Sequence, residues 1–374
     1  MSSPVPVQND WVRGRNRLSI YRLLLGSGAW TRAEVARDTG LSVPTVSTIL
    51  SEFGKMGLVR TAGEAQPRGG RPAQFVYLDA AARHVLALDL SANRARAALL
   101  DLRGNLQLLP EGPELGPGRE TLLMDWIRET LAGVDNNVHV ARLAAAVPGV
   151  VDDLNGHVRL APALGWSDFP LADVLSQVTD LPIVLENDVN ALALAEETVS
   201  SRRHDHALFV RVGGGIGASL LIGGGVYRGA NRAAGEIGYS RLPHLDGSLT
   251  LGAPGPLEAH LISLEDAFLD PSGQLALTTR PAREAFETFA DTLGLIMHNL
   301  VCLLNPECVI ISWPADPSGQ LAKHLGDHWR GPLAVRFEAS RLDDSAALRG
   351  VARLALEALA EDLCLIPSTE GEKR

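Results

Sequence analysis

Three short segments place carboxylate or amide side chains inside otherwise apolar sequence. Asn187 and Asp188 stand where a predicted buried strand ends and a helix begins, Glu236 lies between glycines, and Glu258 opens a further predicted helix. An ionised carboxylate accepts hydrogen bonds from hydroxyl groups, and such charge-assisted bonds contribute ~1.5 to 3 kcal/mol each. Converging in one cleft, these side chains suit a polyhydroxylated ligand. Taken singly, Asp188 could equally cap its helix, and Glu236 could lie in a solvated turn.

The elements that must position these side chains follow an α/β pattern that starts at His84. Residues 84–101 and 208–222 each predict two strands around a tight turn, and their leucines recur at a constant offset. This weak internal repeat predicts a duplicated α/β lobe whose two turns face one cleft. A buried strand is predicted at residues 181–185, just before Asn187, and open α/β sheets place ligands at such strand ends.

Residues 16–78 predict a separate unit of three helices and a hairpin. Thr31 and Glu34 can form a capping box at the second helix, Gly40 ends that helix in a tight turn, and Ser42 caps the third helix. Two short helices joined by a glycine turn are typical of a helix-turn-helix. Two further strands, joined by a loop that contains Gly-Arg-Pro, predict a wing.

The third helix of this unit opens with small hydroxyl side chains on its non-core face. Recognition helices contact base edges with their N-terminal residues, so Ser42, Thr45 and Ser47 are the predicted DNA contacts of the helix. Arg71, in the loop of the wing, is predicted to reach a narrow minor groove. The alternatives are a three-helix core with merely solvated hydroxyl groups and a flexible basic loop.

The charge of the chain is distributed in a way that permits DNA binding. Its 374 residues carry a formal net charge of −10. Residues 1–80, however, hold ten Lys and Arg against six Asp and Glu, a net +4, so the remainder carries −14. A small basic unit on an acidic body can approach phosphates while the body keeps the protein in solution.

Composition excludes several other classes of protein. Hydrophobic residues make up 46% and charged residues 21%, which supports a packed core and excludes general disorder. No apolar run reaches the ~18 to 20 residues that span a bilayer, and the first residues lack a signal-peptide pattern. Cys302, Cys308 and Cys364 are too scattered for a disulfide framework. We expect a cytoplasmic protein without a membrane partner.

The chain resembles the ROK family (repressors, open reading frames and sugar kinases), and within it the transcriptional regulators. The resemblance runs from about Asn16 to Leu363. Its motifs are VPGVVD (147–152), APALGW (161–166), ENDVNALALAE (186–196), RGANRAAGEIGY (228–239) and NPECVII (305–311). It implies an α/β protein in which an N-terminal winged helix-turn-helix is followed by a two-lobed, actin-like (ribonuclease H-like) sugar-kinase-type domain. The implied domains are residues 1–80, which bind DNA, and residues 81–374, which bind sugar and form oligomers.

The resemblance also implies a set of ligand-binding residues. Family members that bind sugar contact its hydroxyl groups from positions that match Asn187, Asp188, Glu236, Tyr239 and Glu258 of this chain, and Gly149 of the VPGVVD turn joins the set. In the kinases of the family, the residue that matches Asp188 is the base for the attacking hydroxyl. Tyr239 replaces a histidine and Ala163 an asparagine of many relatives, so the ligand is predicted to be an unusual sugar, a sugar derivative, or none.

Departures from the family pattern argue against catalysis. The first phosphate loop, D-x-G-G-T in the kinases, reads Asp89-Leu90-Ser91-Ala92-Asn93 here, and Gly214 replaces a threonine in the second. Ser312-Trp313-Pro314 replaces a glycine pair beside the adenosine site. Glycines and a hydroxyl that would cradle phosphate are lost. We therefore expect no ATP binding, no enzyme activity and no cofactor.

A metal site is not expected either. The resemblance would place a zinc motif at residues 239–258, but its histidine and all three cysteines are replaced. His204/His206 and His324/His328 have ligand-like spacing without a supporting cluster of carboxylates or thiolates, and we interpret them as surface residues.

The combined prediction is a DNA-binding transcriptional regulator, a repressor, that senses a sugar without phosphorylating it. A homodimer or homotetramer would place recognition helices on a palindromic operator. Two alternatives remain open at this point: an ATP-dependent sugar kinase with an appended DNA-binding unit, and a DNA-binding regulator with a vestigial ligand pocket.

Overall fold

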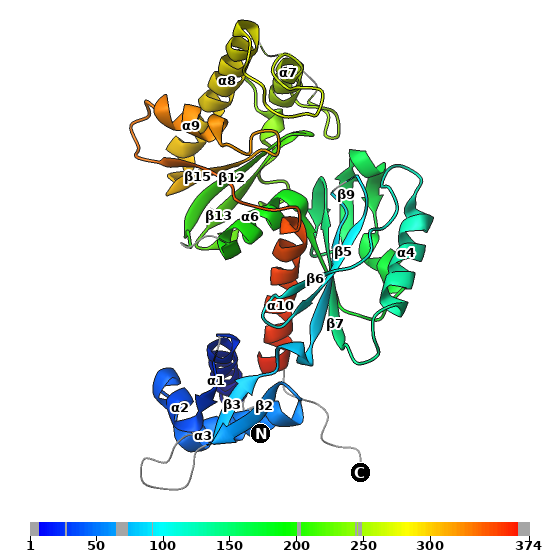
Figure 1. Cartoon of the computed structure of the whole chain (residues 1–374), viewed down its shortest axis with the longest axis vertical. Helices are drawn as coiled ribbons and strands as arrows, with labels where there is room; N and C mark the ends of the chain where they lie inside the picture. The colour runs from blue at the N-terminus through cyan, green and yellow to red at the C-terminus, as the bar shows by residue number, and fades with distance from the viewer. Residues whose placement is uncertain are drawn as a thin grey trace, which may run out of the picture.

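The protein is described by a computed structural model that covers residues 7–26, 28–64, 74–91, 93–199, 203–243, 245 and 249–365. Figure 1 shows a small unit at one end, here called the head (residues 7–78), and two α/β lobes at the other end. The first lobe comprises residues 84–187 and the second lobe residues 203–339. Within the described residues, no helix has the length and apolar character needed to cross a bilayer.

The head contains the three helices and the hairpin that the sequence predicts, and one additional strand. Its elements are α1 (Val7–Leu25), β1 (Trp30–Thr31), α2 (Arg32–Thr39), α3 (Val43–Lys55), β2 (Val59–Glu64) and β3 (Gln74–Leu78). The unpredicted strand β1 pairs with β3, so the sheet has the order β1-β3-β2. Helix α1 begins at Val7, earlier than predicted, because its first half packs on the C-terminal helix, where Gly14 lies against Leu365.

Local caps define the end of α2 and the starts of α2 and α3 in the head. The capping box of α2 is complete: Glu34 donates its backbone N–H to Thr31 Oγ1 at 3.3 Å, and Thr31 donates its own to Glu34 Oε2 at 2.8 Å. Gly40 ends α2 with φ +72°, a left-handed conformation that glycine adopts without strain. Ser42 then caps α3, whose inner face buries Val46, Ile49, Leu50 and Phe53.

The first lobe is a five-stranded sheet with a smaller sheet beside it. The strands and helices are β4 (His84–Asp89), β5 (Arg96–Asp101), β6 (Leu106–Leu108), α4 (Glu120–Ala132), β7 (Val140–Val147), β8 (Val150–Asp152), β9 (His157–Ala161), β10 (Trp166–Phe169), α5 (Leu171–Ser176) and β11 (Ile183–Asn187), with 3₁₀ turns η1 (Ala80–Ala82) and η2 (Pro162–Leu164). Strand β11 and its neighbour β7 are buried and parallel, so both end at the same edge of the sheet.

The second lobe repeats the topology of the first. Its elements are β12 (His206–Val212), β13 (Ile216–Ile222), β14 (Gly225–Val226), η3 (Ile237–Tyr239), α7 (Pro256–Glu265), α8 (Arg280–Leu304), β15 (Cys308–Ser312), α9 (Gln320–Asp327) and β16 (Arg336–Ala339). The sheet orders are β6-β5-β4-β7-β11 and β14-β13-β12-β15-β16. In each sheet, an antiparallel meander of three strands is extended by two parallel strands. The predicted duplication is confirmed.

Two helices connect the lobes and the head. Helix α6 (Asp188–Val199) follows β11 directly, and helix α10 (Ala346–Leu365) packs on α6 with its first half. The second half of α10 reaches the head, where Leu359, Ala360 and Cys364 join the same hydrophobic cluster as Tyr21. Figure 1 shows α10 as the rod between the lobes and the head. The core of the head is therefore completed by a helix from the far end of the chain.

Replacing Gly350 of α10 with alanine tests the close approach of α10 to α6. A Cβ at Gly350 would lie 1.7 Å from the carbonyl oxygen of Ala191, a backbone atom that cannot move aside alone. We expect Gly350→Ala to lower the free energy of unfolding by about 1 to 3 kcal/mol, measured by urea denaturation. Gly54→Ala in α3 is the matched control, because nothing lies within 4 Å of the new Cβ. That control should be neutral or slightly stabilising, and equal effects of the two changes would contradict the packing argument.

Candidate functional site

Asn187 and Asp188 lie at the point where β11 passes into α6. Asn187 Nδ2 donates to the carbonyl oxygen of Gly149 at 2.8 Å and to Asp188 Oδ1 at 3.1 Å. Asn187 Oδ1 accepts the backbone N–H of Asn190 at 3.0 Å. Asn187 therefore supplies the cap of α6 with its amide, while the Asp188 carboxylate accepts the backbone N–H of Val189.

Gly149 forms a turn that no other residue could form in this position. Its φ is +86°, and an added Cβ would lie 2.1 Å from the carbonyl oxygen of Leu160 in β9. The carbonyl of Gly149 faces Asn187, which ties the turn after β7 to the start of α6. Through this hydrogen bond, the backbone of Gly149 lies beside Asn187, one of the candidate ligand-binding residues.

Glu236 and Glu258 form the second-lobe half of the site. Glu236 immediately precedes η3, and Glu258 lies in the first turn of α7. A Cβ at Gly215 would lie 2.7 Å from Glu258 Oε1, so the glycine allows the carboxylate to approach the loop between β12 and β13. Burial and the neighbouring Glu258 raise the pKa of Glu236. Two carboxylates held this close favour a ligand that donates hydrogen bonds.

Contacts between the lobes bring the two halves together. A Cβ at Gly217, in β13, would lie 3.3 Å from Val189 of α6, and a Cβ at Gly252 would lie 3.0 Å from Leu160 of β9. Five of the predicted residues thus belong to one region, here called the interlobe site: Gly149, Asn187, Asp188, Glu236 and Glu258. Their role in ligand binding stays a prediction.

Tyr239 is placed differently from the ligand-facing role predicted for it. Its hydroxyl accepts the backbone N–H of Gly252 at 2.7 Å and donates to the carbonyl oxygen of Ala253 at 3.0 Å. The phenol therefore fastens the loop before α7, and its hydroxyl is engaged by backbone rather than directed at the interlobe site. The physical reason is reach, because the phenol is longer than the imidazole it replaces.

Arg211 is a charged neighbour of the interlobe site that the sequence reasoning missed. It lies in β12, and its guanidinium donates to Ser312 Oγ at 3.3 Å. Burial raises the pKa of Asp188, the backbone N–H of Val189 and the charge of Arg211 lower it, and Asp89 raises it; the net result is a pKa of about 7. The available signal was a single arginine in the apolar run of residues 208–212, next to the glycine loop.

A second group of missed residues bridges the two lobes. Glu186, at the end of β11, is 2% exposed and accepts hydrogen bonds from Arg228 at 2.5 and 2.8 Å. Arg232 pairs with Asp153 at 3.1 Å. Because the arginines belong to the second lobe and the carboxylates to the first, these pairs oppose separation of the lobes. Both arginines belong to the RGANRAAGEIGY motif (228–239), from which only Glu236 and Tyr239 were predicted as functional residues.

In the first phosphate loop, Asp89 and Ser91 are hydrogen-bonded to each other. Asp89 is completely buried, pairs with Arg96 at 2.5 Å, and accepts both the backbone N–H and the hydroxyl of Ser91, at 2.9 and 2.5 Å. The donors that a phosphate would need at Ser91 already have a partner. In the second lobe, Trp313 stacks on Phe289 at 5.2 Å and lies 3.4 Å from where a Cβ of Gly213 would be. Both observations agree with the predicted loss of phosphate binding.

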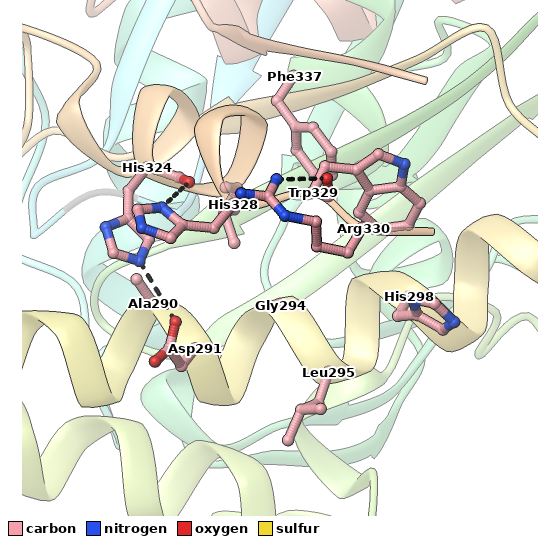
Figure 2. Close-up of a pocket in the computed structure, with 11 residues that line it drawn as sticks. Ala290, Asp291, Gly294, Leu295, His298, His324, His328, Trp329, Arg330 and Phe337 are labelled. Carbon is pink, nitrogen blue, oxygen red and sulfur yellow. Dashed lines mark hydrogen bonds and ion pairs between the residues drawn. The ribbon is translucent and has the colours of Figure 1, made fainter. Parts of the chain in front are cut away.

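The interpretation of the paired histidines as surface residues is wrong for His204. His204 is buried and bonds Glu197 at 2.7 Å. Figure 2 shows His324 and His328 together with His298 around a cavity between α8 and α9, where His324 pairs with Asp291 at 3.3 Å. Among the residues that the structure describes, no three His, Cys, Asp or Glu side chains are grouped so as to hold a metal ion.

The predicted DNA-contacting residues lie at the start of α3. Ser42 is exposed, Thr45 and Ser47 are half-buried, and the hydroxyl groups of Ser42 and Thr45 lie 2.8 Å apart in the cap of the helix. Thr48, which is not among the predicted DNA contacts, is exposed and donates to the carbonyl oxygen of Pro44. Arg71 lies outside the described residues, so its predicted contact with the minor groove stays a prediction.

The duplicated lobes, the strand-end carboxylates and the glycine loops define a mixed α/β protein of the sugar-kinase-like class. The chain belongs to the ROK family, whose family model matches residues 85–358. It is 26% identical to the xylose repressor of Caldicellulosiruptor bescii, over 90% of this chain and 94% of that protein.

Solved structures agree with this fold. A ROK family transcriptional regulator, described as a homologue of the Escherichia coli Mlc protein, covers 95% of this chain and 98% of its own with a TM-score of 0.76 at 20% identity. A ROK family glucokinase from Streptomyces griseus, in complex with glucose and AMPPNP, covers 72% of this chain and 98% of its own with a TM-score of 0.56 at 24% identity. The match to the regulator therefore extends over the head as well. The match to the kinase covers a smaller share of the chain.

The raised pKa of Asp188 makes stability depend on pH. Its pKa of about 7 lies above the ordinary value of 3.8, so the folded state holds a proton that the unfolded state releases between about pH 4 and pH 7. The free energy of unfolding should therefore fall as pH rises through this window, by up to about 1.4 kcal/mol per pH unit. Asp188→Asn should remove this contribution, which urea denaturation at pH 5, 6 and 7 would measure. Asp125→Asn, in the exposed pair with Arg128, should keep the dependence of the unchanged protein; a dependence also retained in Asp188→Asn would contradict the assignment.

Proposed function

We propose that this chain is a DNA-binding transcriptional repressor that responds to a sugar, or a sugar derivative, bound at the interlobe site. One observation carries the proposal: α10 packs on α6, which begins at Asp188, and continues into the core of the head. A change at the start of α6 is therefore passed to the head by two packed helices.

The coupling we propose uses closure of the lobes. A ligand held by Asp188 from the first lobe and by Glu236 and Glu258 from the second favours one angle between the lobes. Because α6 lies between the lobe cores and packs on α10, that angle sets the position of α10 and of the head. The ligand can shift DNA affinity only by its differential affinity for the two arrangements, ~1 to 3 kcal/mol in typical couplings.

The head supplies the DNA-binding half of the proposal. Its capped helices α2 and α3, followed by the β2–β3 hairpin, support a winged helix-turn-helix with α3 in the major groove. We propose residues 1–80 as the DNA-binding domain and residues 81–374 as the sensing and oligomerisation domain. A homodimer or homotetramer would present two heads to a palindromic operator.

The relative named a xylose repressor directs the choice of effector. We propose a pentose or hexose as the first class to test, with D-xylose at the head of the panel. Hydroxyl groups would donate to Asp188, Glu236 and Glu258, and the Asn187 amide, already bonded to Gly149, would orient the turn beside them. The absence of catalysis is part of the proposal and is supported by Asp89, which holds the donors of the first phosphate loop.

The experiment is fluorescence anisotropy of the purified protein on labelled DNA from upstream of its own gene, at a fixed salt concentration, with sugars added. We expect tight binding that one sugar weakens by about 5- to 150-fold, the range of typical couplings. Asp188→Asn should bind the same DNA but lose the response to sugar. Arg71→Ala should bind DNA more weakly and keep its ligand affinity. Tight binding that no sugar disturbs would favour a vestigial pocket, and no specific DNA binding would overturn the proposal.

A second candidate, an ATP-dependent sugar kinase with an appended head, is favoured by one observation. The pKa of Asp188, raised to about 7 by burial, suits a general base that works near neutral pH. Because the donors of Ser91 in the first phosphate loop are already bonded to Asp89, we expect no ADP release above background when ATP and each sugar of the panel are supplied. Sustained ADP release that Asp188→Asn abolishes would establish the kinase instead.

A further inference from the structure

A second cavity lies at the junction of the head and the lobes, where no ligand role has been assigned above. Its volume is about 790 Å³, within the range of small-molecule sites. It is lined by α1 of the head, by the turn after β5, by the end of α6 and by the outer face of α10. None of the residues of the interlobe site lines this cavity.

The cavity combines an apolar floor with guanidinium groups. Leu18, Leu100 and Leu356 contribute apolar surface. Five arginines also line it: Arg22, Arg103, Arg203, Arg349 and Arg353. Three glutamates are present as well: Glu357 pairs with Arg353 at 3.0 Å, Glu197 is bonded to His204, and Glu361 is exposed.

Most of these arginines form no close ion pair. In the part of the chain that the structure describes, no Asp or Glu oxygen lies within 4.0 Å of the guanidinium nitrogens of Arg22, Arg103, Arg203 or Arg349. The half-buried Arg349 donates to Ser345 Oγ, and the hydrogen bond from Ser345 together with the charge of Arg349 lowers the pKa of the nearby Asp343. Arg22, Arg103 and Arg203 are exposed, and Arg103 donates to backbone carbonyls at the end of α1. Guanidinium groups that line a cavity without a paired carboxylate favour an anion within it.

Tyr21 is a further polar group at the same cavity. Its side chain is 1% exposed, and it lines the cavity. Burial raises the pKa of this phenol, so it stays a neutral donor. A ligand with acceptor oxygens would take hydrogen bonds from the Tyr21 hydroxyl as well as from the arginines.

We propose that the cavity between α1 and α10 is a second ligand site, which binds an organic anion with an apolar ring or chain and a carboxylate, sulfonate or phosphate group. The apolar body lies on Leu18, Leu100 and Leu356, and the anionic group takes hydrogen bonds from Arg349, Arg22 and the Tyr21 hydroxyl. Because one wall belongs to the head and the other to α10, an occupant joins them. The site is thus a second input to the head, independent of a sugar between the lobes.

The test uses two fluorescent probes of similar size on the full-length protein. 1-Anilinonaphthalene-8-sulfonate carries an apolar ring system and one sulfonate, whereas N-phenyl-1-naphthylamine has the rings without the charge. We expect saturable binding of the sulfonate at one site per chain, at least tenfold tighter than binding of the neutral probe. No saturable binding, or equal affinity for the two probes, would overturn the proposal.

Variants locate the binding. Arg349→Gln and Arg22→Gln should each weaken the sulfonate by about tenfold and leave the affinity of the neutral probe unchanged. Tyr21→Phe, which removes only the hydroxyl, should weaken the sulfonate by about threefold. Arg280→Gln is the matched control, because Arg280 is 83% exposed on α8 and is not part of the cavity. If Arg349→Gln and Arg22→Gln behave like Arg280→Gln, the sulfonate binds elsewhere and the proposal is wrong.

Discussion

The rest of the structure depends on the close packing of α6 against α10. At Gly350, α10 approaches the carbonyl oxygen of Ala191 so closely that no side chain fits between the helices. This contact fixes the first half of α10 between the lobes, and the second half then completes the core of the head through Leu359, Ala360 and Cys364. Since α6 begins at Asp188, one pair of helices joins the candidate ligand site to the candidate DNA-binding unit.

The interlobe site is held by charges as well as by packing. Glu186 and Asp153 of the first lobe pair with Arg228 and Arg232 of the second, and Glu186 is almost fully buried. A buried carboxylate without such a partner would be costly, so these pairs favour the arrangement in which the lobes meet. In the coupling that we propose, a ligand that changes the angle between the lobes would also change these ion pairs.

The two loops that differ from the kinase pattern are occupied by other residues of the chain in each lobe. In the first lobe, Asp89 takes the donors of Ser91 and the charge of Arg96. In the second, Trp313 fills the space beside the glycine loop by stacking on Phe289. The loop before α7 keeps its course by a different means, since the Tyr239 hydroxyl bonds the backbone of Gly252 and Ala253. The fold is thus kept although the residues of these loops differ from the kinase pattern.

The sequence by itself determined the local elements, because their signals act over a few residues: the Thr31–Glu34 capping box, the glycine turn at Gly40 and the Ser42 cap of α3. It also indicated the duplicated lobe and, through the family motifs, the candidate ligand-site residues, of which Asn187 ends β11 and Asp188 begins α6. Only the tertiary structure decided the pairing of β1 with β3, the contact of α10 with the head, the partners of Glu186 and the direction of Tyr239. Each of these joins residues that are separated in the chain, and such contacts depend on how elements pack rather than on propensity or spacing.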